Sequence, residues 1–400
     1  MSNWNFRLDL EHAHAPQGFR TAGLACGIKK RGGPDLMVLH SPEGANAAAM
    51  FTKNLVRAAP LELDRAHLLE SGGKARVLLV NSGCANAATG PEGKRRAEAT
   101  ARGVAERFGC AAAEVLLNST GVIGVQLAHE KILAALPEAQ ASLQEGSLAH
   151  AARAIMTTDT RPKMVDLRVD HGGKTLHVAG YAKGAGMIHP NMATMIAVLL
   201  TDAEVPAVEL DAHLRYAADR SFHRMSIDGD TSTNDAVFAL ASGNAGAFPA
   251  ELLREALTRV ARELAMMIVK DGEGARKLIR VVVTGARDEA DAAKVCWTVA
   301  SSLLVRTAIA GGDPNWGRII AAVGRSGVDV IVERIALLAC GVPLFRAGAP
   351  VDVPRKQQEE VFARAEIELA IDLGLGSSES DFFTCDLTEG YIHINADYTT

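Results

Sequence analysis

Short, wholly apolar runs alternate with longer, alanine-rich segments along most of this chain of 400 residues. Residues 77–80 and 195–200 are such runs, and their length and apolar character are typical of buried strands. Residues 91–108 and 250–269 have the spacing of amphipathic helices. The alternation predicts an α/β fold of β-sheets covered by helices, and the length favours two or three domains or one large two-lobed unit.

The remaining expected elements fill the intervals between these segments. The patterns predict further strands at 114–117, 277–284, 328–332, 367–372 and 391–395, a hairpin of 164–170 with 175–182, and helices at 127–136, 148–156, 207–220 and 289–304. Polar, glycine-containing residues at 118–121 and 228–235 are expected to form loops.

Charge and cysteine content exclude several classes of function. The net charge is -5 and there is no run of lysine and arginine, so nucleic-acid binding has no electrostatic support. The six cysteines are scattered without metal-ligand spacing, which favours free thiols and no metal site. The start of the chain does not resemble a signal peptide and no apolar run is long enough to span a membrane, so a cytoplasmic protein is expected.

The most unusual segment is 183–194, where glycines, a proline and an asparagine lead to Thr194 at the start of an apolar run. A threonine in that place is ordinarily a strand residue. A chemical interpretation also exists. If the Ala193–Thr194 peptide bond were cleaved, the new α-amine, with a pKa of about 8, would lie beside the hydroxyl and could act as its base.

An acyl-transfer site also needs donors for an oxyanion. Residues 118–121 offer hydroxyl groups and the unencumbered backbone N–H of Gly121, and one such donor is worth roughly 3 kcal/mol to a transition state. The alternative is a turn that ends a strand. His189, in the loop before Thr194, is expected to position that loop, and Asp228, Asp230 and Asp235 lack the pattern of a calcium loop.

Several long motifs resemble the ornithine acetyltransferases, also called glutamate N-acetyltransferases. The segment Lys-Gly-Ala-Gly-Met-Ile-His-Pro-Asn-Met-Ala-Thr-Met resembles the cleavage-site signature of that family, although Ala185 stands where serine is more usual. Other segments resemble further family signatures along the whole chain. They are 22–29, 81–87, 119–124, 156–160, 226–235, 270–274, 312–318 and 395–400.

The resemblance implies a fold shared with the DmpA-type aminopeptidases, a sandwich of β-sheets covered by helices. It implies autocleavage between Ala193 and Thr194 into an α chain of residues 1–193 and a β chain of residues 194–400, assembled as an α2β2 heterotetramer. Thr194 would be the nucleophile, and Thr120 and Gly121 would hold the oxyanion. No cofactor is implied. The implied substrate-binding residues are Thr157, Lys183, Thr194, Glu273, Asn395 and Thr400.

The implied activity is ping-pong transfer of acetyl from N-acetylornithine to glutamate in arginine biosynthesis. Lys183 is a plausible partner for the substrate carboxylate, and Glu273 for the ornithine ammonium. Neutral groups such as Asn395 and Thr400 suit both substrates. Acetyl-CoA as a second acetyl donor stays open. The alternatives are an aminopeptidase-type hydrolase of the same fold and a non-catalytic protein that binds amino-acid metabolites.

Overall fold

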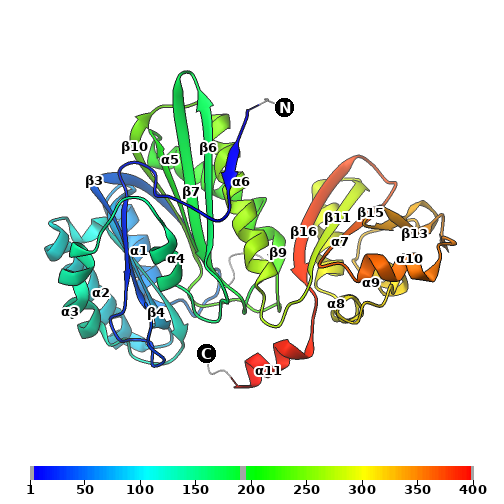
Figure 1. Cartoon of the computed structure of the whole chain (residues 1–400), viewed down its shortest axis with the longest axis horizontal. Coiled ribbons are helices and arrows are strands. Elements are labelled where there is room, and N and C mark those ends of the chain that lie inside the picture. Colours follow the sequence, from blue (N-terminus) through cyan, green and yellow to red (C-terminus); the bar gives the residue numbers. More distant parts are fainter. Residues whose placement is uncertain (1–3, 190–194, 398–400) are drawn as a thin grey trace. The chain divides into compact units, whose positions relative to one another are not determined.

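The computed structural model describes residues 4–189 and 195–397 and divides the chain into two compact units. The first unit comprises residues 1–223, 230–268 and 399–400, and the second comprises 224–229 and 269–398. Each unit contains a mixed β-sheet with helices packed against it (Figure 1). The predicted α/β class is therefore confirmed.

The strands of the described residues form one nine-stranded and one seven-stranded sheet. In the first unit they are β1 (Arg7–Asp9), β2 (Arg20–Leu24), β3 (Leu36–Phe51), β4 (Lys74–Cys84), β5 (Val115–Val122), β6 (Lys163–His171), β7 (Lys174–Lys183), β8 (Ile196–Ala203) and β10 (Ala236–Gly246). In the second they are β9 (Met225–Ser226), β11 (Leu278–Ala286), β12 (Ala336–Ala339), β13 (Val342–Arg346), β14 (Ala349–Pro350), β15 (Glu366–Asp372) and β16 (Ser378–Cys385).

The helices follow the predicted alternation. They are α1 (Ala59–Glu70), α2 (Gly90–Phe108), α3 (His129–Ala141), α4 (Ala149–Ala154), α5 (Ala207–Asp219), α6 (Ala250–Lys270), α7 (Glu289–Ala300), α8 (Leu303–Ala310), α9 (Trp316–Gly324), α10 (Arg355–Phe362) and α11 (Glu389–Asp397), with short 3-10 turns at Ala112–Glu114, Phe222–Arg224 and Val332–Arg334.

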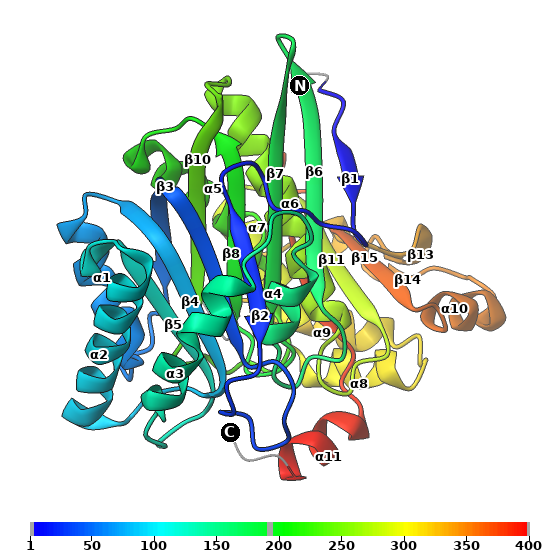
Figure 2. The same ribbon diagram turned by 60° about the vertical axis from the view of Figure 1, so that its left-hand side comes forward.

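The sheet of the first unit has the order β1-β6-β7-β8-β10-β3-β4-β5, with β2 beside β3. One face carries a core cluster that includes Met37, Tyr181 and Phe238, and α1 and α4 pack on this cluster (Figure 2). A second cluster joins β4 and β5 to α2 and α3. Helix α6 lies so close to β7 that a Cβ on Gly180 would come within 2.9 Å of Val260.

The sheet of the second unit has the order β14-β13-β12-β15-β11-β16-β9. Strand β11 runs parallel to β15 and antiparallel to β16, so this sheet is also mixed. Its core cluster brings together apolar residues of the sheet and of α7, α8, α9 and α10.

The predicted loop at 118–121 is a strand in the structure. These residues belong to β5, which pairs in parallel with residues 80–83 of β4. The buried polar side chains find partners there. Ser119 Oγ donates to Asn81 Oδ1 at 2.6 Å, and Ser82 Oγ donates to the carbonyl of Ala154 at 2.6 Å.

Three predictions in the second unit were wrong. Residues 391–395 lie in helix α11 and not in a strand. Residues 328–332 form no strand, since the chain there reaches a 3-10 turn at Val332–Arg334. The helix expected at 289–304 is two helices, α7 and α8, because the Ser302 side chain accepts from the backbone N–H of Val305 and starts a new helix.

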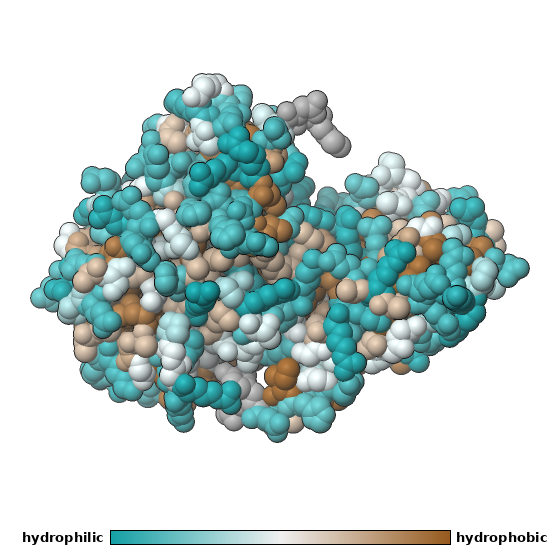
Figure 3. Space-filling view, in the orientation of Figure 1, coloured by the Kyte–Doolittle hydropathy of each residue, from teal (hydrophilic) through white to brown (hydrophobic). Residues whose placement is uncertain are grey.

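The exposed surface is mainly hydrophilic on the face drawn in Figure 3. Within the described residues no single helix is long and apolar enough to cross a membrane; only the bent pair α7 and α8 meets that criterion by length and composition. All six cysteines are free, as expected from their spacing.

Candidate active site

Strands β4 and β5 place Thr120 and Gly121 beside Ser82 and Gly83 in a parallel register. Thr120 is 7% exposed. Gly121 has a φ of +128°, and a Cβ at this position would lie 2.4 Å from the carbonyl carbon of Gly83. Only glycine therefore fits, which leaves the backbone of Gly121 in a conformation that side-chain-bearing residues rarely adopt.

Asn234 connects this strand to the polar loop at 228–235. Its Nδ2 donates to the carbonyls of Ser119 at 2.7 Å and Ala85 at 2.6 Å, and its own carbonyl accepts from Asn118 Nδ2 at 3.1 Å. Asn234 is 4% exposed, so these bonds lie in the interior. This loop was predicted only as part of a family signature, and Asn234 was given no role, because its amide bonds mainly to backbone carbonyls of distant segments.

The same loop leads to the residue that follows Thr194. The backbone N–H of Ala236, at the start of β10, donates to the carbonyl of Met195 at 3.1 Å. Strand β8 begins at Ile196, which pairs with Ala236 on one side and with Lys183 on the other. Lys183 and Ile196 are thus neighbours in the sheet, and residues 234–236 join Met195 to the strand of Thr120.

Asp159 organises the predicted substrate-binding residues Thr157 and Lys183. Its Oδ1 lies 2.6 Å from Lys163 Nζ and accepts from the backbone N–H of Gly184 at 2.7 Å, while its Oδ2 accepts from the N–H of Thr157 at 3.0 Å. Burial alone would raise the pKa of Asp159, but the charges of Lys163 and Lys183 and these hydrogen bonds lower it to about 2.

Lys29 adds a further cation near this cluster. Burial lowers its pKa, as does the charge of Lys183, whereas Asp35 and Asp159 oppose the shift. Asp35 accepts from the backbone N–H groups of Cys26, Ile28 and Lys29 at 2.6 to 2.8 Å and so holds this segment in place. A Cβ on Gly83 would come within 3.1 Å of Lys29. The segment was predicted only as a family signature, and Lys29 was missed.

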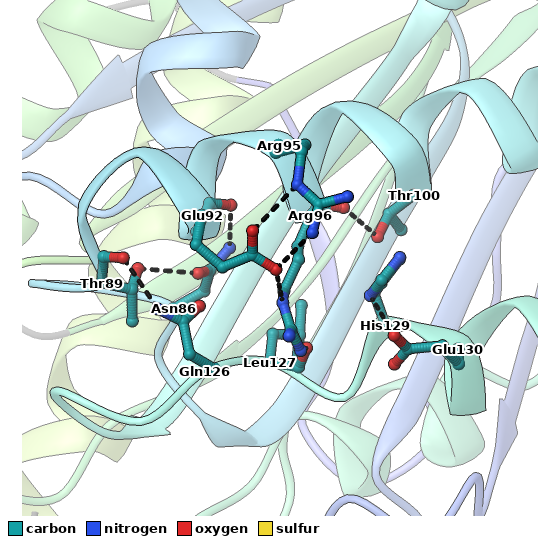
Figure 4. Close-up of polar contacts among 11 residues, drawn as sticks. Asn86, Thr89, Glu92, Arg95, Arg96, Thr100, Gln126, Leu127, His129 and Glu130 are labelled. Carbon is teal, nitrogen blue, oxygen red and sulfur yellow. Dashed lines mark hydrogen bonds and ion pairs between the residues drawn. The ribbon is translucent and has the colours of Figure 1, made fainter.

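A polar network between α2 and the turns that follow β4 and β5 holds these turns in place (Figure 4). Arg96 binds Glu92 Oε1 at 2.6 Å and the carbonyl of Leu127 at 2.7 Å. Gln126 Nε2 donates to the carbonyl of Thr89 at 2.8 Å, which joins the two turns directly. The turns that follow the strands of Gly83 and Gly121 are therefore hydrogen-bonded to each other and to α2.

Glu273 and Asn395 lie together in the second unit. Asn395 Nδ2 donates to Glu273 Oε2 at 2.8 Å. Gly274, with a φ of +71°, approaches α11 so closely that a Cβ would lie 2.3 Å from the backbone nitrogen of Tyr391. The structure thus brings these two predicted residues into contact although 122 positions separate them.

The predicted residues Ala193, Thr194 and Thr400 lie outside the described residues. The predicted division into chains 1–193 and 194–400 also falls there. His189, five positions before Thr194 in the sequence, is half-buried, and burial lowers its pKa while the charge of Asp230 opposes the shift. Among residues 4–189 and 195–397 no group of three His, Cys, Asp or Glu side chains could hold a metal ion.

Comparison with known proteins identifies the family. A family model described as the ArgJ family matches residues 20–400. The chain belongs to the ArgJ family. The arginine biosynthesis bifunctional protein ArgJ of Chlorobaculum tepidum is 45% identical over 388 residues, covering 96% of each chain. That of Nitratidesulfovibrio vulgaris is 45% identical over 389 residues, covering 96% of this chain and 99% of the relative.

A solved structure is also similar to this chain. The ornithine acetyltransferase of Mycobacterium tuberculosis, described as complexed with ornithine, is 40% identical, covers 46% of this chain and 98% of its own, and has a TM-score of 0.42. Membership in the ArgJ family confirms the resemblance seen in the sequence. It also confirms the prediction of an acetyltransferase enzyme of arginine biosynthesis.

Proposed function

We propose that this ArgJ-family chain cleaves itself between Ala193 and Thr194 and then transfers acetyl from N2-acetylornithine to glutamate through an acetyl-threonine. The observation that carries the proposal is the connection around Met195. The backbone of Ala236 binds the Met195 carbonyl, and Asn234, two positions earlier, binds the strand that bears Thr120 and Gly121. The residue after the nucleophile is therefore tied to the strand of the oxyanion donors.

In the first half-reaction, Thr194 Oγ attacks the acetyl carbonyl and its α-amine takes the hydroxyl proton. Thr120 and the N–H of Gly121 stabilise the oxyanion of the tetrahedral intermediate. When the amide bond breaks, the α-amine gives its proton to the departing nitrogen, and ornithine leaves. Acetyl is then bonded to Thr194 in place of the hydroxyl proton, which has left with ornithine, so the charge of the enzyme is unchanged.

In the second half-reaction, the amine of glutamate attacks the acetyl-threonine. Its proton passes through the α-amine to Thr194 Oγ, which restores the enzyme and releases N-acetylglutamate. Lys183, beside the Asp159 cluster, supplies positive charge for the α-carboxylate that both substrates carry. Glu273 pairs with the ornithine ammonium, so Glu273→Gln slows the ornithine half-reaction more than the glutamate half-reaction.

A comparison of products tests this function against the aminopeptidase-type alternative. Purified enzyme is incubated with N-acetylornithine, with and without glutamate, and N-acetylglutamate and free acetate are quantified. The proposal expects N-acetylglutamate to form in proportion to ornithine, with little acetate. Thr120→Ala should lower transfer on the order of 100-fold, and Thr120→Ser, which keeps the hydroxyl, should not. Acetate as the main product in both incubations would instead indicate a hydrolase.

The word bifunctional in the names of the relatives favours a second acetyl donor. We propose that acetyl-CoA can acetylate the same threonine, after which glutamate accepts the group as before. Incubation with acetyl-CoA and glutamate should yield N-acetylglutamate and free CoA. A Thr194→Ala variant is the control, and activity retained in that variant would show that another site transfers the group.

We also propose that the two chains assemble as an α2β2 heterotetramer. Light scattering on the purified protein should give about twice the mass of one 42.2 kDa sequence, because cleavage alone changes the mass of the assembly by only one water per chain. A mass equal to one sequence would contradict this assembly.

A further inference from the structure

A cavity of about 600 Å³ lies within the first unit, and none of the described candidate-site residues lines it. Its floor is the face of β6, β7 and β8 that carries the core cluster. Along β7, Tyr181 and Ala179 belong to that cluster, and the next residue on the same face is His177. Along β8, Leu200 is followed in the same way by Asp202. The apolar face thus becomes polar where the cavity begins.

Two loops form the walls of this cavity, residues 15–19 and 145–146. They are joined to each other, since the backbone N–H of Ala15 donates to the carbonyl of Gly146 at 2.7 Å. The first loop is also joined to β10, because Ser242 Oγ donates to the carbonyl of Gln17 at 2.5 Å. A Cβ on Gly18 would come within 2.7 Å of Ser242. These contacts fix the two loops to each other and to β10.

The charged groups in the cavity leave one carboxylate uncompensated. Asp166 binds His177 Nε2 at 2.8 Å and Arg168 Nε at 3.1 Å. At the rim, Glu145 pairs with Arg20 at 3.2 Å. Asp202 is 4% exposed and accepts from the backbone N–H of His177 at 3.0 Å. Within the described part of the chain no lysine or arginine forms an ion pair with it.

A buried carboxylate without a cation is unfavourable for folding. Burial raises the pKa of Asp202, and the hydrogen bond from His177 and the charges of His177 and Arg168 only partly oppose this shift. Among the charged residues that line the cavity, Glu145 is paired with Arg20 and Arg168 is paired with Asp166, whereas Asp202 has no paired lysine or arginine in the described part of the chain. One positive charge on a ligand would balance Asp202.

We propose that this cavity binds a small organic molecule with an ammonium head group, which pairs with Asp202. The volume is far larger than one inorganic ion needs, and no set of three metal-ligating side chains occurs among the described residues. The aliphatic part of the ligand would lie against Ala15, Pro16 and Phe19, which line the same cavity. This site is separate from the proposed site of acetyl transfer.

Isothermal titration of the purified full-length protein with butylammonium chloride at constant ionic strength tests the site. The proposal expects saturable binding of one ion per chain. Asp202→Asn should weaken binding at least about tenfold, since the variant loses the charge pair. Asp211→Asn is the matched control, because it removes the same charge from an exposed pair with Arg215 in α5 and should bind as the original protein does.

A second variant tests the site independently, in case Asp202→Asn does not fold. Ala15→Leu adds bulk to the lining of the cavity, keeps the charge of Asp202 and should also weaken binding. The proposal is overturned if the original protein shows no saturable binding of butylammonium, or if Asp202→Asn binds it as tightly as the original protein does. It is also overturned by equal binding of 1-butanol, which would indicate only an apolar cavity, or of potassium ions, which would indicate an inorganic cation site.

Discussion

Gly121 is the residue whose identity the backbone constrains most directly. Gly121→Ala would force a Cβ to within 2.4 Å of Gly83 at a φ of +128°, and so displace the proposed oxyanion donor. We expect kcat/KM for acetyl transfer to fall on the order of 100-fold. Gly124→Ala is the control, because its φ is also positive but no atom lies within 4 Å of the added Cβ. Equal losses of kcat/KM in Gly121→Ala and Gly124→Ala would mean that backbone strain alone, and not displacement of the oxyanion donor, lowers the activity.

Asp159 gives a prediction about pH. Its pKa in the folded state, about 2, lies below the unfolded value, so the stability it contributes is present above pH 4 and is lost as pH falls towards 2. Asp159→Asn removes the buried ion pair with Lys163 and should cost about 3 to 5 kcal/mol of unfolding free energy near neutral pH. Urea unfolding should show this cost shrinking below pH 4. A destabilisation by Asp159→Asn that does not change with pH would contradict a lowered pKa of Asp159 in the folded protein.

The sequence predicted most of the candidate site residues through motifs, but not how they are held. Thr157 and Lys183 share Asp159, and Glu273 contacts Asn395. Asn234 and Lys29 were missed because their roles depend on backbone carbonyls and buried charges contributed by distant segments. Such contacts join residues far apart in the sequence, so no local sequence pattern predicts them.

At the scale of elements, helix α11 shows that sequence periodicity predicts secondary structure poorly in short segments. Residues 391–395 alternate like a strand, yet they lie in a helix that begins at Glu389. Similarly, the loop expected at 118–121 became strand because β4 offered a parallel partner. Regular segments such as 91–108 and 250–269 were predicted well, since their pattern extends over several turns. Short or polar segments follow their tertiary neighbours instead.

The turn at Gly274 holds the start of α11. Gly274→Ala would place a Cβ 2.3 Å from the nitrogen of Tyr391, which should shift the helix and break the contact between Asn395 and Glu273. We expect a higher KM for N-acetylornithine with a smaller change in kcat. Gly312→Ala, whose φ is also positive but whose Cβ would meet only Lys277 Nζ at 4.0 Å, serves as the control. An unchanged KM in Gly274→Ala would contradict a substrate-binding role for this pair.

At the scale of the whole molecule, three of the cysteines should behave as unreactive thiols. Burial raises the pKa of Cys26 and Cys296 to about 12 and that of Cys385 to about 11. A thiol reagent at pH 8 should therefore react slowly with these three thiols in the native protein and should find six thiols in denaturant without prior reduction. Fewer than six would reveal a disulfide.

The proposed cut would divide the chain without separating its sheet. Strand β8, which follows the cut, pairs with β7, which precedes it, and β10 likewise pairs with β3. All four strands lie in the first compact unit. We therefore expect the two polypeptides to remain together in native buffer and to separate only in denaturant.

The most direct test of the whole account is the intact mass of the denatured protein after incubation with N-acetylornithine. The account predicts two polypeptides, the second beginning at Thr194 and carrying an added mass of about 42 Da for one acetyl group. The Thr194→Ala variant should remain a single, unlabelled chain. Active enzyme that is still one polypeptide of 400 residues, or acetyl found on the first polypeptide, would contradict it.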